Sequence, residues 1–186
     1  MKILDNINHT VREDLQDTMQ KGSRISIAAA CFSIYAYQEL KKQLEDIAEL
    51  RFVFTSPTFV QENTPKERRE FYIPKLTREK SLYGTEFEVR LRNELTQKAL
   101  AKECADWVRR KVKFRSNVSG EQMPGFMTVG ESSYMPISGF TTVDLGCERG
   151  NNAYYPVQRT EAFENGRYFL SLFDEIWDDS SRLQDV

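Results

Sequence analysis

Residues 24–54 read RISIAAACFSIYAYQELKKQLEDIAELRFVF and contain two apolar runs with an amphipathic stretch between them. The first run, at 25–29, is too continuously apolar for an exposed strand and short enough for a buried one. Helical spacing follows at Tyr37, Leu40, Leu44 and Ile47. A second short strand is predicted at 51–57, where Pro57 ends it. This strand-helix-strand order predicts a parallel pair joined by a right-handed crossover.

The segment before this unit has apolar residues at intervals of four. They are Ile3, Ile7, Val11, Leu15 and Met19, and they predict one helix that ends at Gly22. The same spacing leaves the polar side chains for solvent, namely Arg12, Glu13, Asp14 and Asp17.

The segment after the unit contains further helix and strand patterns. A helix capped by Thr85 is predicted to run to Arg110, with Trp107 in the core. Strands are predicted at 112–118, 125–129 and 139–146. A last helix at 163–177 carries Trp177 on its apolar side, and its acidic end is expected to be solvated or to contact another domain (Asp174, Glu175, Asp178 and Asp179). We therefore predict one α/β domain over 1–186, a mixed sheet with a central parallel portion and helices on both faces.

Charge is strongly segregated along the chain. Residues 65–115 carry fifteen basic and eight acidic side chains, whereas residues 116–186 carry four and eleven. A basic segment favours a polyanionic partner, because bound cations release counterions from a phosphate backbone. We predict an exposed basic loop or insertion at 58–82, and DNA contacts from Lys66, Arg68, Arg69, Arg78, Lys80, Arg109, Arg110 and Lys111. The other interpretation is that these cations lie on ordinary solvated faces, several of them paired with Glu67, Glu70 or Glu79.

Composition narrows the class of protein. With 40% hydrophobic and 29% charged residues, the chain does not have the composition of a disordered protein. Its three cysteines, Cys31, Cys104 and Cys147, form no C-x-x-C pair, so we expect reduced thiols and no metal site. No stretch is long and apolar enough for a transmembrane helix, and we expect a cytoplasmic protein with no membrane partner.

Several long strings resemble one known family, at 26–44, 50–59, 69–76, 81–112 and 139–157. From about Leu4 to Val186 the chain is similar to the segment that precedes the motor in bacterial Swi/Snf-type superfamily 2 helicases. The resemblance implies a phospholipase D-like fold and a fragment of a longer ATP-dependent DNA helicase. It also implies an ATP-hydrolysing motor after Val186 that uses ATP and Mg. The chain itself has no G-x-x-x-x-G-K-S/T string, so ATP binding is expected only in that motor.

Enzymes of the phospholipase D type use an H-x-K-x-x-x-x-D motif, whose histidine attacks phosphorus. The resemblance places Met123 at the histidine, Gly125 at the lysine, and Gly130 or Glu131 at the acid. The only histidine is His9, which we expect to be a surface or capping residue. The family's second phosphate-binding turn is partly kept in ISGFTTVDLG, where Gly139 stands at the asparagine position and Thr141 is retained. Glu148 replaces a required glycine in VDLGCERG, so we interpret that string as a turn and not as a cofactor loop.

These features predict a non-catalytic accessory domain that binds DNA or docks on its own carboxy-terminal helicase motor, with a homodimer also open. The alternative is an active phosphodiesterase or nuclease with a non-standard nucleophile, for which the candidates are Cys147 and Thr141.

Overall fold

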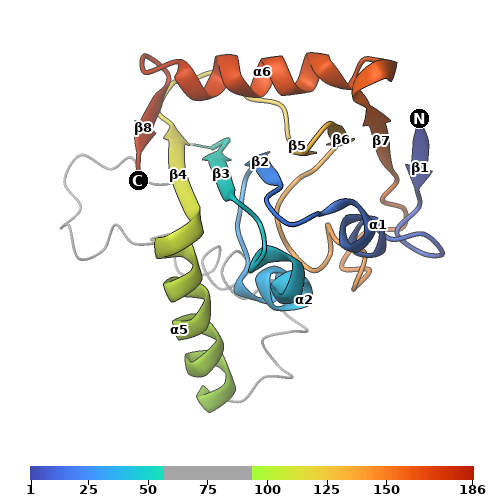
Figure 1. Cartoon of the computed structure of the whole chain (residues 1–186), viewed down its shortest axis with the longest axis vertical. Coiled ribbons are helices and arrows are strands. Elements are labelled where there is room, and N and C mark those ends of the chain that lie inside the picture. Colours follow the sequence, from blue (N-terminus) through green and yellow to red (C-terminus); the bar gives the residue numbers. More distant parts are fainter. Residues whose placement is uncertain (57–93) are drawn as a thin grey trace.

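The computed structural model describes residues 1–56 and 94–186. In these residues, eight strands form one sheet in the order β1-β7-β6-β5-β2-β3-β4-β8 (Figure 1). The strands are β1 (Lys2–Leu4), β2 (Arg24–Ala29), β3 (Glu49–Phe54), β4 (Val112–Asn117), β5 (Phe126–Val129), β6 (Ser132–Met135), β7 (Val157–Glu161) and β8 (Leu183–Asp185). The helices are α1 (Val11–Thr18), α2 (Ile34–Leu44), α5 (Glu94–Lys111) and α6 (Gly166–Asp178), and the 3-10 turn η2 (Ala162–Glu164) precedes α6.

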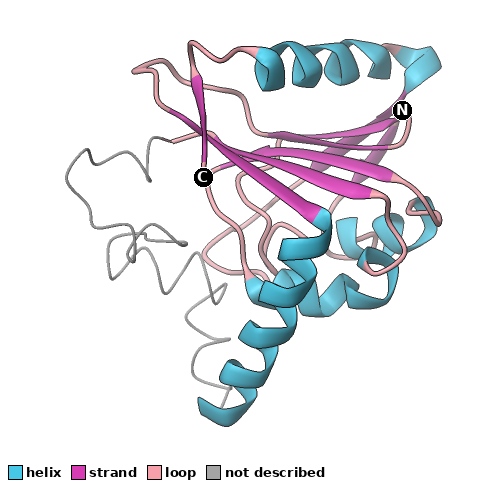
Figure 2. Cartoon of the chain, turned by 60° about the vertical axis from the view of Figure 1, so that its left-hand side comes forward, coloured by secondary structure: helices cyan, strands magenta, loops and turns pink. Residues whose placement is uncertain are grey.

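Strands β2, β3 and β4 are parallel, and the flanking pairs are antiparallel. Helices α1, α2 and α5 lie on one face of the sheet and α6 lies on the other (Figure 2). The larger apolar cluster fills the first face, and a smaller cluster around Phe126 and Phe173 lies under α6. The chain is therefore an α/β protein whose mixed sheet has a central parallel portion and helices on both faces, as the sequence predicts.

The β2–α2–β3 unit follows the prediction from residues 24–54. Ile25, Ile27 and Ala29 are buried on the face that α2 covers, and Ile27 pairs with Phe52 of β3 in parallel register. The Ser33 side chain caps α2 by accepting a hydrogen bond from the Tyr35 N–H at 3.1 Å.

Trp107 attaches α5 to this unit. Its side chain is fully buried, its Nε1–H donates to the Leu44 carbonyl at 3.0 Å, and its ring centroid lies 4.9 Å from that of Tyr37. This confirms Trp107 as a core residue. Trp177 is only half-buried, but it packs on the smaller cluster and stacks on Phe173. The predicted loop at 58–82 and the Thr85 cap lie outside the described residues.

The predicted helix over Ile3 to Met19 is wrong in its first half. Ile3 belongs to β1, Ile7 is exposed, and α1 begins only at Val11. The Asp5 carboxylate accepts hydrogen bonds from three successive backbone N–H groups, Ile7 to His9, and holds a turn there. A capping box between Thr10 and Glu13 then starts the helix. Short polar side chains therefore override the four-residue apolar spacing.

The predicted strand at 139–146 is also wrong, because this segment forms successive turns. Thr141 starts them, since its carbonyl accepts from the Leu145 N–H at 3.0 Å and its side chain bonds Asp144. Strands β6, β7 and β8 were not predicted. They are only three to five residues long. Strands β7 and β8 gain their hydrogen bonds from strands that are distant in sequence, whereas β6 pairs with the distant β7 and also with β5, which directly precedes it.

Candidate functional site

The predicted phosphate-binding slots meet at the carboxyl end of β2. The loop after β2 and the turn at 138–144 lie side by side, because Ala30 N–H donates to the Ser138 carbonyl and Phe140 N–H to the Cys31 carbonyl. Ile137 N–H donates to the Gly125 carbonyl at 3.0 Å. The structure therefore brings Gly125 and Gly139, two positions named by the family motifs, to one edge of the parallel strands.

Gly125 has no room for the family's lysine. A Cβ atom added there would overlap the backbone carbonyl oxygen of Ile137, and that backbone is fixed by its bond to Gly125 itself. A cationic side chain at this position would require both segments to separate.

The turn after β6 is closed by its own carboxylate, Asp144. The Thr141 hydroxyl donates to Asp144 Oδ2 at 2.5 Å, and the Gly139 N–H donates to Oδ1 at 3.1 Å. The Tyr155 hydroxyl donates to the same Oδ1 at 2.5 Å and accepts from the Ser138 N–H at 3.0 Å. Asp144 is only 5% exposed. The donors of this turn point at an internal carboxyl group, not at solvent.

Burial dominates the electrostatics of this turn. It raises the pKa of Asp144, while the hydrogen bonds from Thr141 and Tyr155 act in the opposite direction. Burial, followed by the charge of Asp144, also raises the pKa of Tyr155. A phosphate entering here would have to displace Asp144, because Gly139, Thr141 and Tyr155 already donate to its carboxyl group.

The other residues aligned with the phospholipase D motif, Met123, Gly130 and Glu131, do not contribute to this turn. The Met123 side chain packs toward α6, against the smaller apolar cluster. Gly130 and Glu131 follow β5 at the opposite edge of the sheet, where the Gly130 N–H donates to the Arg24 carbonyl. Thr141 is 8% exposed and committed to Asp144, whereas Cys147 is exposed.

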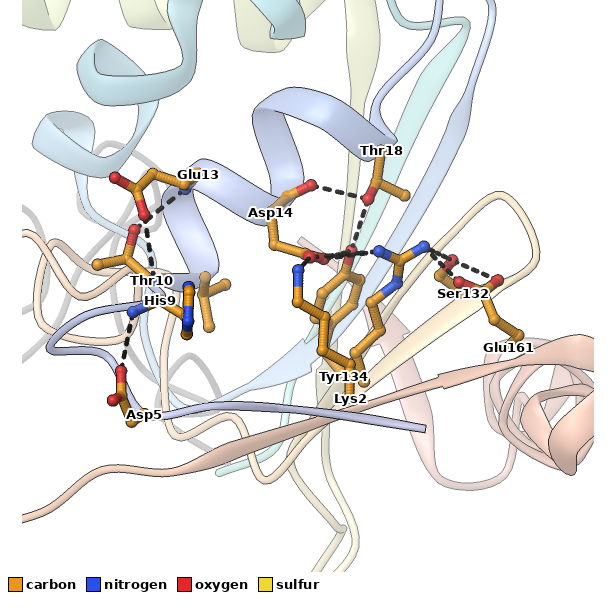
Figure 3. A network of polar contacts seen from close by, with 12 residues as sticks. Lys2, Asp5, His9, Thr10, Glu13, Asp14, Thr18, Ser132, Tyr134 and Glu161 are labelled. Carbon is orange, nitrogen blue, oxygen red and sulfur yellow. Dashed lines mark hydrogen bonds and ion pairs between the residues drawn. The ribbon is translucent and has the colours of Figure 1, made fainter.

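His9 is distant from this turn in sequence, although Asn6 and Arg12 on either side of it donate hydrogen bonds to the carbonyls of Asp144 and Leu145. It is exposed and precedes the Thr10 cap of α1, so it lies outside the helix, and its backbone N–H donates to Asp5 Oδ1 (Figure 3). The prediction of a surface residue is confirmed. Hydrogen bonds from the backbone of His9 and Ile7 lower the pKa of Asp5.

A polar network between α1 and the sheet was not predicted from the sequence. Asp14 was expected to face solvent, but it is 4% exposed. Its carboxylate accepts from Lys2 Nζ at 2.7 Å, from the Tyr134 hydroxyl at 2.9 Å, and from Arg159 Nη1 at 3.2 Å (Figure 3). No local signal reveals it, because its partners lie on β1, β6 and β7. This network links α1 to the sheet, and within the described residues Arg159 Nε is its one buried nitrogen without a hydrogen-bond partner.

Three of the residues predicted to contact DNA lie in the last turn of α5, namely Arg109, Arg110 and Lys111. Arg109 pairs with Asp106 at 2.9 Å, Arg110 pairs with Glu45 at 3.2 Å, and Lys111 Nζ donates to the Ile47 carbonyl at 2.8 Å. The Arg109 and Arg110 side chains are 70% and 57% exposed. The other predicted contacts lie outside the described residues (Lys66, Arg68, Arg69, Arg78 and Lys80).

Within residues 1–56 and 94–186, no group of three or more His, Cys, Asp or Glu side chains is placed to hold a metal ion. In the same residues, no helix has the length and apolar character that a bilayer-spanning segment needs.

Comparisons with known proteins leave the family open. No protein-family model matches the chain, and no curated protein matches it. Nine chains of solved structures match. One belongs to TrmBL2, described as an archaeal chromatin protein whose structure shows a novel mode of DNA binding, with 10% sequence identity and a TM-score of 0.49. That match covers 100% of this chain and 53% of the TrmBL2 chain, so the chain spans about half of that protein's length. A similarity at this level carries no conclusion about what this chain binds.

Proposed function

We propose that this chain is a non-catalytic accessory domain that contacts DNA through the basic end of α5 and the segment before it. The observation that carries the non-catalytic part of the proposal is the turn closed by Asp144. Its hydroxyl and N–H donors, from Thr141 and Gly139, are used inside the protein. Phosphodiester cleavage needs such donors free to stabilise charge on the phosphoryl oxygens.

The charge distribution supports DNA as the ligand. Fifteen basic side chains lie within residues 65–115, against eight acidic ones. Arg109 and Arg110 are paired with acidic residues, but both pairs are largely exposed. Such pairs contribute about 0–1 kcal/mol, so a phosphate backbone can replace the acidic partner at little cost.

The motor is the second part of the proposal. The resemblance to Swi/Snf-type helicases supports a phospholipase D-like domain attached to an ATP- and Mg-dependent motor, with docking on that motor as a further role. A homodimer belongs to the same proposal. The helicase part of the proposal is supported by the similarity of the sequence strings at 26–44, 50–59, 69–76, 81–112 and 139–157.

A salt-dependent DNA titration tests the proposal. Fluorescence anisotropy with a labelled duplex should give log K falling linearly with log salt, with a slope of about 0.9 per neutralised phosphate. Arg109→Glu should weaken binding by about tenfold, equal to about 1.4 kcal/mol. The charge-matched control is Arg167→Glu, an exposed position on α6 across the sheet, which should leave binding unchanged.

Two results would count against the proposal. Absence of binding even at low salt would remove the DNA contact and leave only docking on the motor. Hydrolysis of a generic phosphodiester by the pure chain, abolished by substitution of Cys147 or Thr141, would establish the enzymatic alternative.

A further inference from the structure

A cavity lies on the face of the sheet that α6 covers, away from the basic end of α5. It has a volume of about 210 Å³ and opens between the loop before β5 and the carboxy-terminal half of α6. Met123, Leu172 and Ile176 provide its apolar wall. The same three side chains are only partly buried against the smaller apolar cluster. The cavity is therefore an accessible extension of that cluster.

The rim of the cavity is acidic. Three carboxylates, from Glu121, Glu175 and Asp179, line it together with one guanidinium, from Arg182. Arg182 bonds two of them, Glu121 at 2.9 Å and Asp179 at 2.5 Å. Hydrogen bonds from Ser181 and then Arg182 lower the pKa of Asp179 to about 2, which keeps it charged at neutral pH. Among the described residues, Glu175 forms no ion pair.

The carboxy-terminal part of α6 and its C-cap beside the cavity carry the same sign of charge, from Asp174, Glu175, Asp178 and Asp179, of which Asp174 pairs with Arg51. An acidic rim repels a phosphate backbone and attracts a cationic ligand, so this surface does not extend the proposed DNA contact.

The size of the cavity limits the ligand. It holds several times the roughly 30 Å³ that a water molecule occupies in the liquid, but it is smaller than the roughly 300–1,000 Å³ typical of small-molecule pockets. One aliphatic side chain fits these limits. Binding energy at protein interfaces is often concentrated in such an anchor, surrounded by polar contacts.

We propose that this cavity binds a basic peptide segment of a partner protein, which inserts one leucine- or methionine-sized side chain between flanking lysines or arginines. The inserted side chain contacts Met123, Leu172 and Ile176. The flanking cations pair with Glu175 and with the outer carboxylate oxygens of Glu121. The inference goes beyond the proposed function, because neither DNA contact nor loss of catalysis requires it.

Methyl NMR on the whole chain tests this site with three capped hexapeptides. The peptide KLKKLK should shift the Met123 methyl signal in a saturable manner. The peptide KGKKGK retains the charge without the anchor and should bind at least about tenfold more weakly, a loss of about 1.4 kcal/mol. The acidic peptide ELEELE should cause no shift.

Two variants separate local pairing from general attraction. Glu175→Lys reverses an exposed charge at the rim and should weaken KLKKLK binding by about tenfold. The matched control, Glu131→Lys, changes the net charge equally at the opposite edge of the sheet and should have no effect.

The proposal is overturned if Met123 does not respond to millimolar KLKKLK. It is equally overturned if KGKKGK binds as tightly as KLKKLK, or if Glu131→Lys weakens binding as much as Glu175→Lys. DNA binding measured on the same samples stays separate, because it depends on Arg109 and not on this rim.

Discussion

At the scale of single residues, two buried carboxylates have opposite electrostatic environments. The Asp14 carboxylate accepts hydrogen bonds from three side chains, those of Lys2, Tyr134 and Arg159. Burial alone would raise its pKa, but the hydrogen bonds from Lys2 and Tyr134, together with the charge of Arg159, lower it overall. Asp144 has only uncharged donors, and burial raises its pKa. Asp14 is therefore a stabilising ion, whereas Asp144 is costly to ionise.

Asp14→Ala should lower the free energy of unfolding by about 3 kcal/mol, because Arg159 and the Tyr134 hydroxyl would lose a buried partner. Urea unfolding followed by tryptophan fluorescence measures the change. Asp17→Ala, an exposed position on the same helix, is the control and should change stability by less than about 0.5 kcal/mol. Equal losses in both variants would show that helix propensity, not the network, determines the result.

The stabilisation from Asp14 should also depend on pH. A lowered pKa in the folded state means that the contribution is present above the unfolded pKa, near 3.8, and is lost as pH falls through the folded value. The difference in unfolding free energy between the wild type and Asp14→Ala should therefore shrink on acidification below about pH 4. A difference that stays constant down to pH 2 would contradict the assignment.

Asp144→Asn should show the opposite dependence on pH. A raised folded pKa means that the native state holds the proton more tightly, so the wild type loses stability as pH rises above 3.8 toward the folded pKa. Relative to wild type, Asp144→Asn should gain stability as pH rises above about 4 until the folded pKa is passed, by at most about 1.4 kcal/mol for each pH unit. Urea unfolding at successive pH values measures this, and a gain on acidification would contradict it.

At the scale of elements, the apolar pattern correctly predicts those helices and strands whose formation is decided by their own sequence. The β2–α2–β3 unit and α6 follow it closely, because their buried residues recur with the period of the element. The pattern fails over residues 3–10 and 139–146, where the side chains of Asp5 and Thr141 compete with regular structure for backbone hydrogen bonds. Edge strands such as β8 depend on partners distant in sequence, which no local pattern contains.

Helix α6 is attached to the sheet by its own aromatic side chains and by arginines of β3 and β4. The Arg51 guanidinium lies 4.9 Å from the Phe173 ring centroid and 5.7 Å from that of Trp177, and it pairs with Asp174 at 2.9 Å. Arg115 lies 5.5 Å from the Trp177 ring. These contacts give the wall of the proposed peptide cavity a fixed position.

Phe173→Ala should therefore cost about 3–5 kcal/mol of unfolding free energy, since Phe173 is the fully buried residue of α6 in the smaller apolar cluster. Tyr168→Ala removes a 64% exposed ring from the same helix and should cost less than about 1 kcal/mol. Urea denaturation of both variants measures the difference. A small effect of Phe173→Ala would mean that α6 contributes little to the folded state.

At the scale of the whole molecule, the sequence predicts which residues are missing from the site but not how the site is closed. The absence of a histidine near Met123 is visible in the sequence, and so are the glycines at 125 and 139. The bond between Thr141 and Asp144 and the contribution of Tyr155 are not, because they depend on turns that the apolar pattern misassigned. The DNA contacts predicted for the basic residues at 66–80 stay a prediction.

Opposite charges also occupy different parts of the fold. The described basic residues of the predicted DNA-contact set lie at the end of α5, on one face of the sheet, and the acidic rim lies beside α6, on the other (Figure 2). This arrangement allows one face to contact a nucleic acid while the other binds a basic protein segment.

The most direct measurement is a backbone amide NMR titration of the chain with a short DNA duplex. We expect shifts at Arg109, Arg110 and Lys111 that weaken with salt, and no shift at Gly139 or Thr141, because Asp144 already occupies their donors. Shifts centred on Gly139 and Thr141, or cleavage of the duplex during the titration, would contradict the account.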